Sequence, residues 1–256
     1  MTKVLQRTLT KLTFINLPML LLSSTGFVLL CFSNIGRTNN GTNIFVSILG
    51  GIEIQDYGGS LPLLELGKWL LILSIFLLNI GNYIENEVEA MQLYAFLRYR
   101  SYKRWWIHLI NNITVLAVTY LVFGFLIIGV LGQTVLSKNN IESTSILHGS
   151  TLQVLSLGIT LFVHFLFLGV WLLTFTLITR KYILSFAGTM IIECSTLVWG
   201  ILAPQNSKYL PGVWGMYLRS KGFSTKDGFS VPIIIGVQVL LILGFSYMVM
   251  HKMKRN

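Results

Sequence analysis

Six stretches of predominantly apolar residues, each long enough to cross a bilayer, constrain this chain more than any other feature. They cover residues 14–32, 66–84, 107–131, 152–179, 183–203 and 231–250. An α-helix needs about 20 such residues to span the hydrocarbon core. Charged residues make up only 11% of the chain, whereas an ordinary soluble domain has about 25%. The sequence therefore predicts an all-α integral membrane protein, with six transmembrane helices in one domain of residues 1–256.

The basic residues predict how these spans are oriented. Twelve of the 19 Lys and Arg residues fall into the same set of alternate connections and termini. Positive residues are enriched in cytoplasmic loops, so we expect both termini in the cytoplasm. The twelve are Lys3, Arg7, Lys11, Arg98, Arg100, Lys103, Arg104, Arg180, Lys181, Lys252, Lys254 and Arg255. The net charge of +10 is thus explained by topology and by contact with the lipid bilayer, and we expect no nucleic-acid partner.

Residues 1–13 predict an amphipathic helix that lies in the cytoplasmic interface. Lys3, Arg7 and Lys11 are four residues apart and so share one face, while apolar residues occupy another. A basic tail that only fixes topology is the alternative. The following apolar run, 14–32, is longer than the core of a cleaved signal peptide and no A-x-A site follows it. We therefore expect it to be a retained span.

The connection between spans two and three, residues 85–106, predicts a short cytoplasmic helix that docks on a partner protein. Carboxylates open this connection, and apolar and aromatic residues follow. Four basic residues then precede Trp105 and Trp106, which stand where the chain re-enters the membrane. We expect both tryptophans in the headgroup region, where the ring is buried and its N–H stays hydrated. An interfacial helix without a partner is the alternative.

This layout resembles the permease subunits of ABC-2 type transporters, especially small bacterial permeases for peptides, lantibiotics and bacteriocin immunity. The run LRYRSYKRWW, residues 97–106, is similar to the coupling helix of those permeases. There, a basic-Ser-basic-basic-aromatic string precedes the third span. The resemblance implies that an ATPase subunit contacts Phe96, Leu97, Arg98, Arg100, Ser101, Lys103, Arg104, Trp105 and Trp106. It also implies short re-entrant or interfacial helices within residues 204–230, where a plain surface loop is the alternative.

The same resemblance implies the function. It describes a permease subunit of an ATP-driven exporter in the bacterial cytoplasmic membrane, paired with a second permease copy in a homodimer or heterodimer. Amphipathic or hydrophobic peptides are the expected substrates, because few charges line the spans. The sequence has no G-x-x-x-x-G-K-[ST] phosphate loop and no HExxH, GxSxG or GxGxxG motif. We therefore expect no catalytic residue, metal site or cofactor in this chain, with ATP and Mg bound by the partner ATPase.

Polar residues inside the spans are candidates for the pathway or for gating. Glu193 lies near the middle of the fifth span, where an ionised carboxylate is costly. We expect it to be protonated or to face a partner such as His164 of the fourth span, and structural pairing is the alternative to a functional role. Asn79 and Asn82 of the second span are expected to hydrogen-bond between helices.

Two other classes of function stay open. A non-transport membrane protein, such as an assembly partner or sensor subunit, would have no ATPase partner. A proton-coupled secondary transporter would use Glu193 as its proton carrier. This second class is less favoured, because the sequence has no inverted repeat and no matching pair of Gly/Pro-broken helices.

Overall fold

The computed structural model describes residues 23–30, 44–52, 62–85, 101–138, 151–222 and 231–255. Every regular element within these ranges is a helix, so the all-α prediction is confirmed for the described part of the chain. Residues 23–30 are helical. The remaining elements are α3 (Ile44–Leu49), α4 (Leu63–Ile84), α6 (Tyr102–Lys138), α7 (Thr151–Thr179), α8 (Tyr182–Leu202), η3 (Pro204–Tyr209), α9 (Pro211–Trp214), α10 (Tyr217–Gly222) and α11 (Val231–Arg255).

Five of the described helices are long and apolar enough to cross a membrane. They contain the segments Leu63–Gly81, Lys103–Leu131, Leu152–Thr179, Tyr182–Leu202 and Pro232–Val249, which correspond to the second to sixth expected spans. The first expected span, 14–32, is described only at 23–30. The expected interfacial helix with Lys3, Arg7 and Lys11 lies outside the described residues. The chain is thus a multi-pass helical protein with five candidate spans in its described part.

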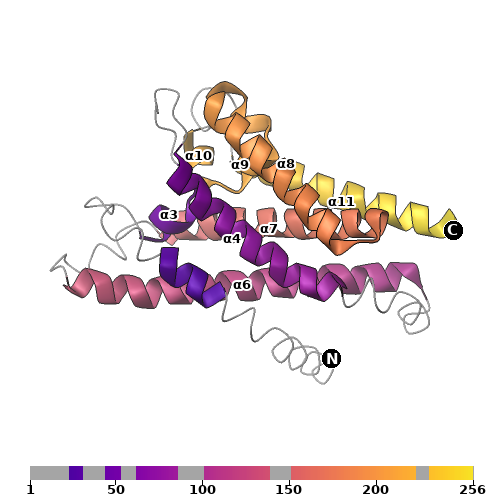
Figure 1. Ribbon diagram of the computed structural model, residues 1–256, viewed down its shortest axis with the longest axis horizontal. Coiled ribbons are helices and arrows are strands. Elements are labelled where there is room, and N and C mark those ends of the chain that lie inside the picture. Colours follow the sequence, from indigo (N-terminus) through magenta and orange to yellow (C-terminus); the bar gives the residue numbers. More distant parts are fainter. Residues whose placement is uncertain are drawn as a thin grey trace, which may run out of the picture.

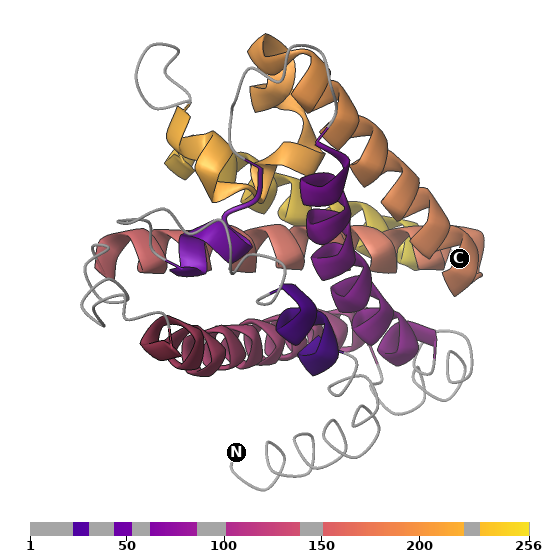
Figure 2. The same ribbon diagram turned by 60° about the vertical axis from the view of Figure 1, so that its left-hand side comes forward.

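Helix α7 is the centre of the bundle. It packs against α4, α6, α8 and α11, and it is the most buried of the five candidate spans. Figures 1 and 2 show α6, α7 and α11 running along the molecule, with α4 and α8 crossing them obliquely. Helix α7 is therefore in contact with each of the other four candidate spans.

The helix ends gather at two ends of the bundle, as a chain that crosses repeatedly requires. Figure 1 shows α3 and α10 at one end, and the C-terminus and the α7–α8 connection at the other. The backbone N–H of Leu218 donates a hydrogen bond of 2.9 Å to the carbonyl of Gly50. This bond joins two connections that the charge pattern places on one side of a membrane.

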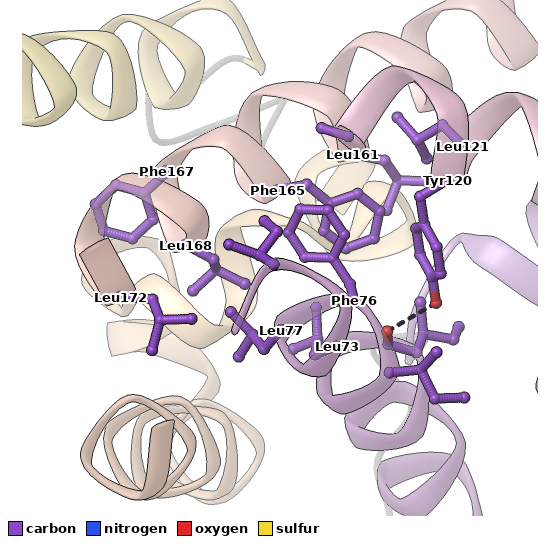
Figure 3. Close-up of a cluster of buried hydrophobic side chains, with 14 of the residues drawn as sticks. Leu73, Phe76, Leu77, Tyr120, Leu121, Leu161, Phe165, Phe167, Leu168 and Leu172 are labelled. Atoms are coloured by element: carbon purple, nitrogen blue, oxygen red, sulfur yellow. Dashed lines mark hydrogen bonds between the residues drawn. The ribbon is translucent and has the colours of Figure 1, made fainter. Parts of the chain in front are cut away.

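An aromatic cluster joins the three helices that form most of the core (Figure 3). Phe76 of α4 stacks on Phe165 of α7 with ring centroids 4.3 Å apart, and Tyr120 of α6 lies 5.4 Å and 5.6 Å from these two rings. The Tyr120 hydroxyl donates to the carbonyl of Ile72 at 2.9 Å. Offset and tilted ring pairs of this kind add stability beyond the area they bury.

Glycine permits the closest approach of these helices. A Cβ atom at Gly169 of α7 would lie 2.6 Å from Cγ2 of Ile113 and 3.1 Å from Cδ1 of Ile80. A larger residue at position 169 would therefore force the Ile113 side chain to shift where α4, α6 and α7 meet. Small residues at such crossings are typical of membrane helices, because association there depends on close van der Waals packing.

Candidate functional site

Of the residues expected to contact an ATPase, those that the structure describes lie at the start of α6. Phe96, Leu97, Arg98 and Arg100 lie outside the described residues, and Ser101 precedes the helix. Lys103 and Arg104 are exposed on its first turn. The described part of this segment is therefore a basic turn at one end of a long helix.

Trp105 and Trp106 lie in the core, which corrects the expectation that their N–H groups are hydrated in the headgroup region. They are only 4% and 1% exposed, and their indole N–H groups have no partner among the described atoms. The reason is that α6 runs unbroken from Tyr102 into its span, so both residues belong to the first turn of that span. They continue the inward face formed by Leu109 and Ile113.

Two tyrosines, Tyr83 and Tyr182, connect the helices at this end. Nδ2 of Asn112 in α6 donates to the hydroxyl of Tyr83 in α4 at 2.7 Å. The ring of Tyr182, the first residue of α8, covers Gly81 of α4 so closely that a Cβ there would overlap it. The Tyr182 hydroxyl lies 3.5 Å from the carbonyl of Leu77. The ends of α4, α6 and α8 are thus held together next to the basic turn.

The α7–α8 connection is a tight hairpin. Arg180 adopts the left-handed conformation with φ 57°, and its N–H donates to the carbonyl of Thr176 at 2.8 Å. The hydroxyls of Thr179 and Ser185 lie 2.8 Å apart across the turn. Arg180 and Lys181 are both exposed, so a second pair of cations lies at this end of the bundle.

His164 of α7 is fully buried and pairs with Gln238 of α11. Nδ1 of His164 lies 3.1 Å from Nε2 of Gln238. With the amide as placed, its N–H donates to Nδ1, which assigns the imidazole hydrogen to Nε2. Nε2 of His164 and Oε1 of Gln238 have no partner among the described atoms. Sequence reasoning missed Gln238, although an amide in the middle of an apolar run is a signal for it.

Glu193 of α8 is 2% exposed and faces the interior of the bundle. It follows Ser185 and Thr189 on the buried face of the helix, so this face is polar at three successive turns. Oε2 of Glu193 has no partner among the described atoms. The described hydrogen bonds pair His164 with Gln238 rather than with Glu193, which corrects the expected Glu193–His164 pair.

Asn79 takes the structural role that its position predicts. Its Nδ2 donates to Oγ of Ser23 at 2.9 Å and so joins α4 to the helical stretch 23–30. The side chain of Asn82, the other polar candidate on α4, lies outside the described part.

Helix α9 folds back between α8 and α7. The N–H of Gly212 donates to Oγ1 of Thr196 at 3.1 Å, and a Cβ at Gly212 would lie 2.6 Å from the carbonyl oxygen of Glu193. Glu193 precedes the end of α8 at Leu202 by nine residues, so α9 reaches about 14 Å down that helix. On the other side, a Cβ at Gly215 would lie 2.9 Å from Nε2 of His164.

This segment is buried rather than a plain surface loop. Gly212, Val213 and Trp214 are all buried, and Trp214 lies 6.0 Å from Phe167 of α7, centroid to centroid. The segment is therefore a buried turn that packs inside the helix bundle.

Arg219 anchors the same end of the bundle. Its guanidinium is buried and donates to the carbonyl of Gly200 at 2.7 Å and to that of Ile52 at 3.3 Å. These bonds connect α10 with the end of α8 and with the segment after α3. Sequence reasoning missed this residue, because its partners are backbone atoms from distant parts of the chain.

Comparison of the chain with protein-family models, with curated proteins and with solved structures finds no match. Within the described residues, no three His, Cys, Asp or Glu side chains group closely enough to hold a metal ion. The described fold thus defines the class of protein, a helical multi-pass membrane protein with buried polar side chains, among them His164, Gln238 and Glu193, and an exposed basic turn.

Proposed function

We propose that this chain is the permease subunit of an ATP-driven exporter of the ABC-2 type, in the bacterial cytoplasmic membrane. It works with a second permease copy and a separate ATPase subunit, and it moves amphipathic or hydrophobic peptides for export or for self-immunity. One observation carries the proposal. Lys103 and Arg104 project from the first turn of α6, while the next two residues, Trp105 and Trp106, are fixed in the core.

This arrangement suits the transmission of force. Helix α6 has 37 residues and is therefore about 55 Å long, so a push on its basic turn acts along the whole bundle. The same push reaches α4 through the Asn112–Tyr83 bond. It reaches α8 through α4, because the Tyr182 ring sits on Gly81. An ATPase that closes against this turn would displace three helices together.

The proposed peptide substrates agree with the charges in the described spans. Glu193 is the one buried carboxylate among the described residues. A pathway for small ions would call for more intramembrane charge or for a ring of coordinating groups. The apolar faces of the candidate spans, which we expect to contact lipid or a second permease copy, would also contact the apolar side of an amphipathic substrate.

Co-purification tests the ATPase contact. We would express the chain with the ATPase encoded beside its gene and compare the wild type with the double variant Lys103→Glu, Arg104→Glu. The matched control is Arg180→Glu, Lys181→Glu, which reverses two exposed cations at the same end of the bundle. We expect the first variant to lose the ATPase and the control to keep it, with both eluting as folded protein from size exclusion.

Two results would count against the proposal. Loss of the ATPase in both variants would show a general charge effect rather than docking on α6. Absence of a complex between the wild type and any ATPase would remove the proposal and favour the non-transport alternative, an assembly partner or sensor subunit.

The buried carboxyl group of Glu193 favours a second candidate, a proton-coupled secondary transporter. Its unpartnered Oε2 lies inside the bundle, where ionisable groups often belong to proton relays. The two candidates differ in their energy source. Extrusion of a fluorescent amphipathic peptide that survives ATP depletion, stops when the proton gradient collapses and is lost in Glu193→Gln would establish the second candidate instead of the first.

A further inference from the structure

The α7–α8 hairpin carries two exposed cations between exposed aliphatic side chains. Arg180 and Lys181 make up the whole connection between the two helices, and both are exposed. Ile178 on the α7 side is exposed, as are Ile183 and Leu184 on the α8 side. Exposed aliphatic side chains of a membrane span face acyl chains, while Lys and Arg near helix ends extend to the headgroups. The two cations therefore stand where acyl chains meet headgroups.

The far end of α8 indicates the opposite headgroup layer. Trp199 is 61% exposed and follows Lys181 by 18 residues, or about 27 Å along the helix axis. Tryptophan is enriched at both membrane interfaces, and the hydrocarbon core between them is about 30 Å thick. Lys181 and Trp199 are thus spaced like residues in the two headgroup layers, and a connection of two residues cannot extend far beyond the lipid surface.

The backbone that carries the two cations is held in place. The N–H of Arg180 bonds back to the last turn of α7, and the hydroxyls of Thr179 and Ser185 lie 2.8 Å apart across the turn. The ring of Tyr182 packs on Gly81 of α4. A ligand that binds here therefore has to order only the side chains of the cations, which lowers the entropic cost of binding.

The charge of the hairpin is not neutralised by the described part of the protein. Neither Arg180 nor Lys181 forms an ion pair with a described carboxylate. Glu85, the exposed residue directly after α4, acts electrostatically on the neighbouring Tyr182 but does not pair with either cation. A phosphate group at this place would accept charge-assisted hydrogen bonds from both side chains.

We infer that the α7–α8 hairpin binds an anionic phospholipid, with Arg180 and Lys181 on its phosphate and the flanking aliphatic side chains along its acyl chains. The basic turn of α6 differs, because Lys103 and Arg104 lead directly into Trp105 in the core. The inference goes beyond the proposed function and does not depend on an ATPase partner.

Native mass spectrometry of the purified full chain with defined lipids tests this inference. The probes are phosphatidylglycerol, which is anionic, and phosphatidylcholine, which has no net charge, with identical acyl chains. We expect the wild type to bind the first phosphatidylglycerol more tightly than phosphatidylcholine. The double variant Arg180→Asn, Lys181→Gln should weaken phosphatidylglycerol binding about thirtyfold, or about fivefold for each cation, and leave phosphatidylcholine binding unchanged.

Three controls locate the effect. The matched variant Lys103→Gln, Arg104→Gln neutralises two exposed cations at the same end of the bundle and should keep the affinity for phosphatidylglycerol within about twofold. Asn is compatible with the left-handed backbone at position 180, where φ is 57°, so the hairpin variant should fold. The exchange variant Arg180→Lys, Lys181→Arg keeps both charges and should retain the lipid. Inorganic phosphate should displace the lipid no better than sodium chloride of equal ionic strength.

Five outcomes would overturn the inference. Equal affinity of the wild type for the two lipids would show that the headgroup charge is not recognised. Unchanged affinity in the hairpin variant would place the lipid elsewhere. An equal loss in the α6 variant would show diffuse attraction by the whole basic end. An equal loss in the exchange variant would show that a disturbed turn, not the missing charge, is the cause. Displacement by inorganic phosphate beyond the sodium chloride control would show a site for free phosphate.

Discussion

Replacement of Gly81 by alanine is expected to destabilise the bundle, because the new methyl group would occupy the place of the Tyr182 ring. A Cβ at Gly81 would overlap three atoms of that ring, Cζ, Oη and Cε2. Overpacking of this kind typically costs about 1–3 kcal/mol. The shift of the ring also breaks its contact with Leu77, worth about 1 kcal/mol, which roughly cancels the gain in helix propensity from Gly to Ala. The expected net loss is therefore about 1–3 kcal/mol.

The same substitution elsewhere in α4 provides the control. Gly67 has nothing within 4 Å of its Cβ position, so Gly67→Ala is expected to be neutral or to stabilise by up to about 1 kcal/mol. Both variants are compared by SDS titration in mixed micelles, with helicity followed by circular dichroism. A Gly81→Ala protein as stable as Gly67→Ala would refute the packing argument.

A double-mutant cycle isolates the contact itself. In a Tyr182→Ala background the ring is absent, so Gly81→Ala should lose its penalty and the two substitutions should couple by about 1–3 kcal/mol. A penalty of the same size with and without the ring would place the strain elsewhere in the helix crossing.

Three further predictions use the same titration. Asn79→Ala should lower the free energy of unfolding by about 0.6 kcal/mol and by no more than about 1.7 kcal/mol. This loss should vanish when Ser23 is already alanine, and a loss independent of Ser23 would contradict the bond between them. Tyr120→Phe keeps the ring cluster but removes the hydrogen bond to the Ile72 carbonyl, so the free energy of unfolding should fall by about 1 kcal/mol. Unchanged stability would show that this bond makes no net contribution. Arg219→Gln should lower the free energy of unfolding by about 2–5 kcal/mol, because two carbonyl groups lose a charged donor. Arg219→Lys keeps the charge and should lower it less. Equal losses in the two variants would mean that the charge does not contribute to stability there.

Hydropathy predicted the spans because each helix needs about 20 consecutive, mostly apolar residues to cross the lipid. The fourth span was expected at 152–179, and α7 runs from Thr151 to Thr179. The third was expected to begin at residue 107, whereas α6 begins at Tyr102. The difference arises because basic residues end an apolar run without ending a helix. This extension of α6 is what carries Trp105 and Trp106 into the core.

The interior of the site depends on contacts that no single segment encodes. Polarity alone identified His164 and Glu193, but their partners are chosen by how α7, α8 and α11 pack. The choice of Gln238 for His164 follows from two parallel helices in register. The depth of α9 depends on Gly212 and Gly215, whose close contacts with α8 and α7 appear only once the chain folds back. A sequence shows the glycines but not the surfaces that they approach.

Helix α8 is attached to other helices near both of its ends. Its first residue, Tyr182, packs on Gly81 of α4. Toward its far end, Thr196 accepts a hydrogen bond from Gly212 of α9. Between these points its buried face is polar, with Ser185, Thr189 and Glu193. The Thr189 hydroxyl bonds to its own helix, whereas the Ser185 hydroxyl also lies 2.8 Å from that of Thr179 in α7. Helix α8 is therefore attached to α4 and α7 at its start and to α9 toward its far end, and a polar buried face separates the two attachments.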